Sequence, residues 1–427
     1  MEKLVSDMND EIATAAAEGR NVEYDATRFS WTRRMEDFAK KNQTIDLGER
    51  AVVKGMYRPF CKQWVYYNKV MNERTYQQPR LFPLASGKGE KAERTYQQHA
   101  SFVAVEGKGG VEMTYQQTSL HCLGNVVISV SERGCLITDY LPDLELLHHG
   151  QCFPLYWYEE KTNNNGGLFA ETGEQKSGYV RHDAITDETL RVFREVYPNE
   201  YGKGSGRTIE QAKADGLPDS VARTNERFEI NKIDIFYYVY GILHSPEYRE
   251  RFAANLQKEL PRIPLSRNFK DFAAAGRGLA KLHLNYESVE PWPVKERNNS
   301  TEIGPVTKIK WGKRKDPETG KKVDDHTVLI YNENLVIRDI PESAQRYVVN
   351  GRSPLDWVID RYQLKTDKAS GIVNNPNDYS DDPRYIVDLI EKLITVSMQT
   401  MEIVDALPPL AEMPQPTNWP LAWKMSK

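Results

Sequence analysis

The sequence predicts a mixed α+β fold, because the pattern of its apolar residues changes several times along the 427 residues. Short runs of β-branched and aromatic residues, bounded by turn residues, occupy residues 52–158. Apolar residues with helical spacing follow over 185–290, and strand-like runs return over 300–345. The length suits several subdomains, since one domain typically has about 100–200 residues. We expect 1–50 to be a helical lead-in, 51–225 an α/β part, 226–295 a helical subdomain, 296–350 a small β subdomain, and 351–427 C-terminal helices with a proline-rich tail.

The first part of the chain is predicted to change from helix to strand. Residues 1–50 have mainly helical spacing. Strands are then predicted where aromatic and β-branched residues cluster, at Trp64–Tyr67, Asn125–Val130 and Pro154–Tyr158. Lys161–Ser177 is rich in Asn, Gly, Glu and Lys, which is typical of a loop or linker.

The middle part is predicted to be helical. Asp187 is a suitable N-cap for a short helix. Ile230–Leu243 has apolar residues on nearly every side, which indicates a buried helix. Ser245, Pro246 and Glu247 provide an N-cap, a first-turn proline and an acid, so a new helix is predicted there, to run until Pro261. A further amphipathic helix is predicted over Phe269–Leu284.

The last part returns to strands and ends in helices. Strand-like runs cover Val306–Trp311, Thr327–Tyr331 and Leu335–Ile340. Ser353 with Pro354 predicts the start of a short helix, and Asp382 with Pro383 the start of a longer one that reaches about Leu407.

The composition excludes several classes of protein. No apolar run approaches the ~18 residues of a membrane-spanning helix, so we expect no membrane partner. The first twelve residues alternate acidic and apolar side chains, unlike a signal peptide. Four cysteines are too few for a disulfide scaffold of this length, which favours a reducing cytoplasm.

Patterns that would indicate catalysis or a cofactor are weak. Asp143, Glu159 and Lys161 imitate the two carboxylates and the lysine of metal-dependent nucleases, which leaves a free-standing Mg²⁺ nuclease as an alternative function. The glycine-rich stretch Gly202–Thr208 lacks the Lys-Ser/Thr ending of a Walker phosphate loop. The cysteines form no C-x-x-C pair, so a zinc site is not predicted. We therefore expect no cofactor and no metal in this chain.

Positive charge is concentrated in two islands, although the formal net charge is −4. Residues 53–99 carry 9 basic and 3 acidic side chains, and residues 308–322 carry 7 and 2. The first island also holds aromatic residues and glutamines. Cations bind phosphates, and Arg and Gln can form paired hydrogen bonds with guanine and adenine, so both islands are candidates for contact with nucleic acid. The candidate DNA-binding residues are Arg58, Lys62, Arg74, Gln77, Arg80, Lys313, Arg314 and Lys315.

Several longer segments resemble a known family. They are YRPFCKQWVYYN (Tyr57–Asn68), DYLPDLELLHHGQCFPLYWYE (Asp139–Glu159), YYVYGILHSPEYRERFAANLQKELPRIPL (Tyr237–Leu265) and NGRSPLDWVIDRYQLKTDKASGIVNNPND (Asn350–Asp378). These segments resemble the C-terminal specificity region of the single-chain Type ISP restriction–modification enzymes. The TYQQ copies at Thr75, Thr95 and Thr114 depart from the family pattern.

The resemblance implies a target-recognition module. In that family, one polypeptide joins a nuclease, a translocating motor, an adenine methyltransferase and this DNA-reading end. The implied partners are double-stranded DNA and the methyltransferase, motor and nuclease parts of the same system. The implied function is sequence-specific binding of duplex DNA that directs methylation and cleavage carried elsewhere. Because Lys313, Arg314 and Lys315 are consecutive, we expect them to follow the phosphate backbone, whereas Arg58, Arg74 and Arg80 are the candidates for reading base edges.

Overall fold

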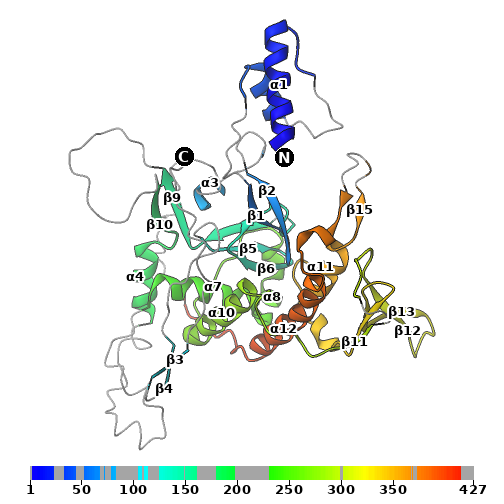
Figure 1. Ribbon diagram of the computed structural model, residues 1–427. Coiled ribbons are helices and arrows are strands. Elements are labelled where there is room, and N and C mark those ends of the chain that lie inside the picture. Colours follow the sequence, from blue (N-terminus) through cyan, green and yellow to red (C-terminus); the bar gives the residue numbers. More distant parts are fainter. Residues whose placement is uncertain are drawn as a thin grey trace, which may run out of the picture.

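The structure is a computed structural model that describes residues 2–23, 33–44, 52–67, 72, 78–82, 104–107, 110–113, 125–148, 150–160, 179–197, 230–298, 302–366, 368 and 373–414. Within these residues the fold is mixed α+β, as predicted, with several small sheets beside a group of helices (Figure 1). The predicted loop at Lys161–Ser177 and the glycine-rich stretch Gly202–Thr208 lie outside the described residues. None of the helices in these ranges is long and apolar enough to cross a membrane.

Two helices lie near the N-terminus, where the sequence has mainly helical spacing. They are α1 (Glu2–Glu18) and α2 (Arg33–Lys40). Buried Val5, Met8 and Ile12 of α1 pack with Met35 and Ala39 of α2 in a small core of their own. Apolar residues three to four positions apart produce this contact, because they share one face of a helix.

A three-stranded sheet follows, in the order β2-β1-β7. Strands β1 (Val52–Arg58) and β2 (Cys61–Tyr66) form a tight hairpin, and β7 (Leu141–Pro142) lies parallel to β1 on its other side. The hairpin turn requires a positive φ of 60° at Phe60. The short helix α3 (Gln78–Leu81) buries Leu81 near Leu141. Lys54, Arg58 and Lys62 of the first predicted basic island lie on this sheet.

The neighbouring sheets are antiparallel. Strands β5 (Val127–Ser131), β6 (Gly134–Thr138) and β8 (Gln151–Pro154) pair in the order β6-β5-β8. Two further pairs are β9 (Tyr156–Glu160) with β10 (Tyr179–Asp183), and β3 (Ala104–Gly107) with β4 (Gly110–Met113). Every residue of β5 and β6 is buried, including the polar Ser129, Ser131 and Thr138.

The helical part has the predicted elements with two corrections. Helices α7 (Lys232–His244) and α10 (Phe269–Leu284) pack against each other, and α10 has its predicted bounds. Helix α4 (Asp187–Val196) is capped by Thr186, not by Asp187, because the Thr186 hydroxyl accepts from the Thr189 amide. The predicted helix up to Pro261 is divided into α8 (Pro246–Arg251) and α9 (Ala253–Leu256). It breaks at Phe252, whose φ and ψ of −105° and 15° leave the helical region.

Buried polar side chains connect this helical part to its neighbours. The Tyr240 hydroxyl on α7 accepts from the Ile137 amide of β6 and lies 2.6 Å from His283 Nδ1 on α10. His283 Nε2 lies 2.9 Å from the Thr400 hydroxyl. His244 lies one turn after Tyr240, with its Nδ1 2.9 Å from the Tyr240 carbonyl oxygen, and it contacts the Cys135 thiol. Because these groups are paired, burying them costs little.

The lowered pKa of His244 predicts a loss of stability in mild acid. Burial, with a smaller contribution from Arg249, lowers the pKa of His244 to about 4. In the unfolded chain the pKa is about 6.5, so between these values the unfolded state binds more protons and stability falls as pH falls. The full loss in the free energy of unfolding between these two pKa values is about 3 kcal/mol. Urea midpoints from pH 7 to pH 4.5 should therefore fall less steeply in His244→Asn than in the wild type. His148→Asn, at an exposed histidine, is the control and should keep the wild-type dependence of the urea midpoint on pH. The same dependence in His244→Asn as in the wild type would contradict the prediction.

A four-stranded antiparallel sheet and two helices complete the described chain. The sheet order is β11 (Lys295–Asn298), β14 (Leu335–Arg338), β13 (Lys322–Ile330) and β12 (Lys310–Lys315). Helix α11 (Pro354–Arg361) begins at the predicted Ser353 cap, and α12 spans Tyr385–Asp405. Short elements near them are η3 (Glu342–Gln345), β15 (Lys365–Thr366), β16 (Val373–Asn374) and η4 (Pro376–Tyr379).

One predicted strand begins later than expected. The sequence predicts pairing from Val306, but β12 begins at Lys310. The backbone of Val306 is instead bonded at both its amide and its carbonyl by the Asn377 side chain, at 2.8 and 2.9 Å. A side chain 71 positions away thus replaces the strand partner.

Candidate nucleic-acid interface

The candidate DNA-binding residues fall into two separate places. Arg58 and Lys62 lie on β1 and β2, and Arg80 lies on α3 nearby; Lys313, Arg314 and Lys315 lie on β12. Figure 1 shows the β1–β2 hairpin and the β12–β13 hairpin in different parts of the molecule. Arg74 and Gln77 lie outside the described residues. The described residues of the two islands therefore lie apart and form no single patch.

Arg58 is held in a fixed pose at the end of β1, the central strand of its sheet. Its Nη1 donates to Asp143 Oδ1 at 2.9 Å and to the Tyr57 carbonyl at 2.6 Å. The guanidinium also lies 4.2 Å from the centre of the Tyr57 ring. Asp143 follows β7, so this ion pair joins two strands that are 85 residues apart in sequence. The guanidinium is partly buried but reaches the surface, with 18% of the side chain exposed.

Lys62 has a different environment. Only 9% of its side chain is exposed, and its ammonium lies 2.7 Å from Glu287 and over the rings of Tyr140 and Tyr286. Burial acts to lower the pKa of Lys62, but the charge of Glu287 and the contact with Tyr140 outweigh it, so its pKa is raised. An ammonium with these partners favours a structural role over contact with DNA.

A pocket of about 360 Å³ lies at the β7 edge of the same sheet. Its polar lining includes the amide side chains of Gln63, Asn72 and Gln78, together with Tyr57 and two carboxylates: Asp143, which is paired with Arg58, and Glu145. Gln78 donates from Nε2 to the Pro142 carbonyl and Gln63 donates to the Tyr379 hydroxyl, which orients both side chains. Asn and Gln are side chains that recognise adenine edges, so this pocket is the described surface best suited to base reading.

Trp64 and Lys54 lie directly opposite each other on the hairpin. Trp64 is 68% exposed, and the Lys54 ammonium lies 5.1 Å from its ring centre. An exposed indole beside a cation is suited to stacking on bases or packing on a sugar–phosphate chain. From the sequence, Trp64 was predicted to lie on a strand within the basic and aromatic island, but it was not among the candidate DNA-binding residues, and Gln63 and Asn72 were overlooked. Alternation along β2, with Gln63 and Val65 on one face, is the signal that would have found Gln63.

Arg80 is exposed on α3, close to this pocket. The helix is held in place because Asn125 Nδ2 donates to the Leu81 carbonyl at 2.9 Å, while Leu81 and Phe82 are buried. Arg80 is therefore an exposed side chain on a fixed helix that also carries Gln78 of the pocket.

The β12–β13 hairpin presents an unusual arrangement of charges. In its register Lys313 lies opposite Asp324, with which it forms an ion pair at 2.6 Å, but Lys315 lies opposite Lys322. Both of these lysines are exposed, and neither forms an ion pair with any residue in the described ranges. Like charges directly opposite on a sheet destabilise it, so this pair has no structural benefit. It is suited to binding an anion.

Arg314 points to the other face of β12, as expected for consecutive residues on a strand. It pairs with Glu342 at 2.7 Å. Lys313 and Lys315 share the opposite face, so the three residues do not face one groove.

The described residues of the alternative nuclease site have other partners. Asp143 pairs with Arg58, and Glu159 lies 3.2 Å from His182 on the neighbouring strand. Lys161 lies outside the described residues. In the ranges that the structure describes, no group of three or more His, Cys, Asp and Glu side chains is placed to hold a metal ion. The geometry does not favour the nuclease.

Comparison with protein families gives the decisive observation. The family described as the Type ISP C-terminal specificity domain matches residues 1–91 and 108–389. The chain belongs to this family. The internal gap at residues 92–107 contains the second ERTYQQ copy, Glu93–Gln98, whereas the copies at Thr75 and Thr114 lie within the matched residues. The expected departure from the family pattern is therefore seen for the second copy only. Comparison with curated proteins gives no match.

Solved structures of Type ISP enzymes resemble this specificity domain. The ATP-dependent Type ISP restriction–modification enzyme LlaBIII bound to DNA is 28% identical, with a TM-score of 0.66 over 97% of this chain and 22% of that chain. A nuclease-deletion mutant of the Type ISP enzyme LlaGI with a DNA substrate mimic is 27% identical, with a TM-score of 0.65 over 96% of this chain and 31% of that chain. A DrdV–DNA complex is 26% identical, with a TM-score of 0.64 over 96% and 33%. This chain thus spans about a quarter to a third of the length of these structures.

Two of the segments that carry the resemblance contribute residues to the candidate pocket of the specificity domain. Tyr57–Asn68 contains the β1–β2 turn, and Asp139–Glu159 contains β7, β8 and most of β9. Tyr379, which follows the last resembling segment, accepts the hydrogen bond from Gln63. Parts of the sequence that resemble the family and lie far apart along the chain therefore meet at this sheet.

Proposed function

We propose that this chain reads the sequence of duplex DNA as the specificity module of a restriction–modification system, and so directs adenine methylation and cleavage carried by other domains or chains. The observation that supports it most is the similarity of nearly the whole chain to a part of LlaBIII, an enzyme whose structure contains bound DNA. The chain corresponds to only 22% of that enzyme, so the chemistry is assigned to the remainder.

The two surfaces have different tasks in this proposal. The pocket at the β7 edge, with oriented amides and the nearby Arg58 and Arg80, reads base edges. The β12–β13 hairpin, with Lys313, Lys315 and Lys322 on one face, contacts phosphates. Phosphate contacts determine affinity and its dependence on salt, whereas base contacts determine sequence preference.

The chain needs no cofactor of its own in this proposal. It binds DNA without ATP, S-adenosylmethionine or metal, inside the cytoplasm, and its protein partners are the methyltransferase, motor and nuclease parts of the system. The absence of a metal-binding cluster among the described residues is compatible with this division.

Sequencing of bound duplexes tests the function directly. The purified chain is mixed with a random duplex library at moderate salt with EDTA, and the retained DNA is sequenced. We expect enrichment of one short site. Retention without any enriched sequence would contradict sequence reading, and Mg²⁺-dependent cleavage of plain duplex would instead support the nuclease.

Replacing Arg80 with alanine is predicted to weaken sequence preference more than general affinity. If its guanidinium forms paired hydrogen bonds with a base, its loss costs about 1–3 kcal/mol on the preferred site and much less on random DNA. The same expectation holds for Arg74. Arg133, exposed on the β5–β6 turn, provides a control with the same loss of charge. Equal losses on both duplexes for Arg80→Ala would remove it from the reading surface.

A further inference from the structure

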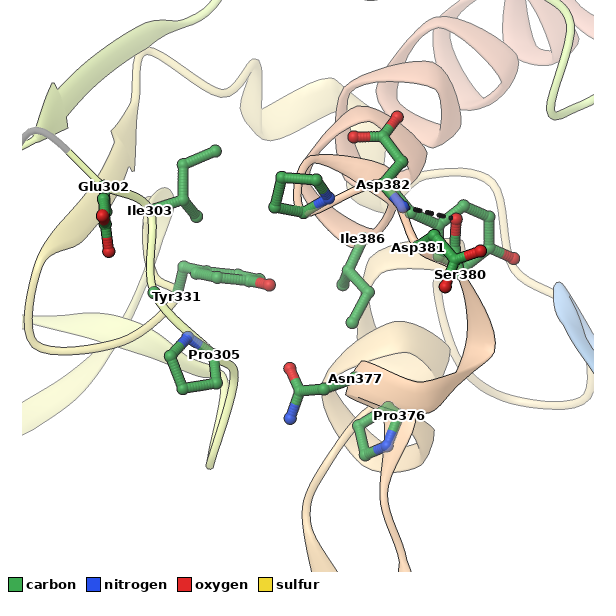
Figure 2. A pocket seen from close by; sticks show the side chains of 13 residues that line it. Glu302, Ile303, Pro305, Tyr331, Pro376, Asn377, Ser380, Asp381, Asp382 and Ile386 are labelled. Carbon is green, nitrogen blue, oxygen red and sulfur yellow. Dashed lines mark hydrogen bonds between the residues drawn. The ribbon is translucent and has the colours of Figure 1, made fainter.

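A second and larger pocket, of about 710 Å³, lies between the four-stranded sheet and the start of α12. Figure 2 shows Glu302, Ile303 and Tyr331 on one side of it and Asp381, Asp382 and Ile386 on the other. Neither basic island contributes a residue to it.

The charge of this pocket is opposite to that of the islands. Among the residues that the structure describes, its lining contains the three carboxylates of Glu302, Asp381 and Asp382 and neither lysine nor arginine. All three acidic residues are exposed at the rim. A phosphate chain would be repelled here, so DNA is a poor occupant, and a cation is a good one.

The walls between the carboxylates are apolar. They are formed by Ile303, Ile386, Tyr331, Tyr385 and the prolines Pro305, Pro376 and Pro383. Such a lining excludes a bare hydrated ion as the natural occupant, because an ion has no apolar surface to bury. It suits a side chain with an apolar stem and a cationic end. Arginine fits best, because its planar guanidinium offers five donors and can bond carboxylates on two sides at once.

The pocket is held open by its own hydrogen bonds. Asn332 Nδ2 donates to the Ile303 carbonyl at 2.8 Å, next to Gly304, whose φ of 74° turns the loop. Asn377 joins the opposite side to Val306 through two bonds. Asp382 accepts from the Arg384 amide at 2.9 Å, which fixes its carboxylate at the start of α12. A preformed site loses little conformational entropy on binding.

We infer that this pocket binds an arginine side chain presented by a protein segment of the larger enzyme, and that it docks the specificity domain onto its catalytic partner. Charge complementarity supports this occupant, as does the length of the DNA-bound relatives, of which this chain covers only 22–33%. The inference does not depend on which bases the domain reads. It assigns the two faces of the chain different partners, with DNA on the basic hairpins and protein at the acidic pocket.

Methyl NMR tests the inference on the full chain. Isoleucine methyl groups are labelled, Ile303 and Ile386 are assigned by Ile→Val variants, and N-acetyl-arginine methylamide is titrated in. We expect both methyl signals to shift with a dissociation constant of about 1 mM, equivalent to about 4 kcal/mol. The neutral isostere N-acetyl-citrulline methylamide should produce no comparable shift. Asp381→Asn/Asp382→Asn should weaken arginine binding about fivefold or more, whereas Glu318→Gln, in the β12–β13 turn, should leave it unchanged.

Three results would overturn the inference. They are equal binding of the citrulline compound, no shift of Ile303 and Ile386 at about 20 mM arginine compound, and shifts of these two methyls by a short duplex DNA. Failure of DNA binding in the library experiment would leave these titrations unaffected, so the two proposals fail separately.

Discussion

Gly276→Ala is expected to destabilise the chain by about 3 kcal/mol or more. A Cβ atom on Gly276 would lie 1.8 Å from the Tyr237 carbonyl oxygen and 2.7 Å from the Gly241 amide, both backbone atoms of α7. Gly241 faces it, and a Cβ there would lie 2.1 Å from the Phe272 carbonyl oxygen. The two helices cross in backbone contact at these glycines, so a methyl group can be accommodated only if the helices move apart. That movement would loosen the buried core around Tyr238 and Phe272.

Whether alanine at position 276 lowers or raises stability distinguishes the close helix crossing from helix propensity. In an exposed helix interior, alanine is more favourable than glycine by about 1 kcal/mol, so propensity alone predicts stabilisation. Gly278, two residues further along α10, provides the matched control, because its Cβ would meet only the flexible Ile403 Cδ1 at 3.3 Å. Urea unfolding should show a much lower midpoint for Gly276→Ala and an unchanged or higher one for Gly278→Ala. Similar midpoints in the two variants would contradict the close crossing.

The elements that the sequence predicted well are those with strong local signals. Ser245 and Ser353 cap their helices as expected, because the N-cap serine and the following proline act over four residues. Phe269–Leu284 has its predicted bounds because apolar spacing covers four turns. The start of β12 and the break at Phe252 were not predictable in this way. Each depends on a contact or backbone angle set by the surrounding structure, such as the Asn377 side chain at Val306.

The sequence predicted which segment of the candidate site is basic and aromatic, but not which of its side chains are exposed. Arg58 and Lys62 are four residues apart in a basic and aromatic segment, yet one reaches the surface and the other is buried against Glu287. Glu287 is 225 residues from Lys62 along the chain, so no local pattern distinguishes the two. The pocket at the β7 edge likewise combines residues from β1, β2, α3 and β7. The charge of a segment is visible in a sequence, whereas the partner that neutralises it is not.

Lys315→Gln/Lys322→Gln is expected to weaken DNA binding roughly 50-fold at about 0.1 M salt. Each lost phosphate contact reduces the slope of log affinity against log salt by about 0.9, and two such losses amount to this factor between about 1 M and 0.1 M salt. The loss should be equal on preferred and random duplexes, since phosphates carry no sequence. Lys313→Ala and Arg314→Ala should each reduce the slope by about one if they also contact phosphates.

The stability of the same variant separates a binding role from a structural one. Lys315 and Lys322 lie opposite each other and repel, so their neutralisation should leave the urea midpoint unchanged or raise it. A double variant with the same change in net charge, Lys258→Gln/Arg267→Gln on the helical part, should retain both the salt slope and the affinity within about threefold. If the two double variants lose affinity equally, net charge alone explains the effect and the hairpin is not a phosphate-binding surface. If only the hairpin variant loses affinity while its stability is kept, the facing lysines act in anion binding and not in folding.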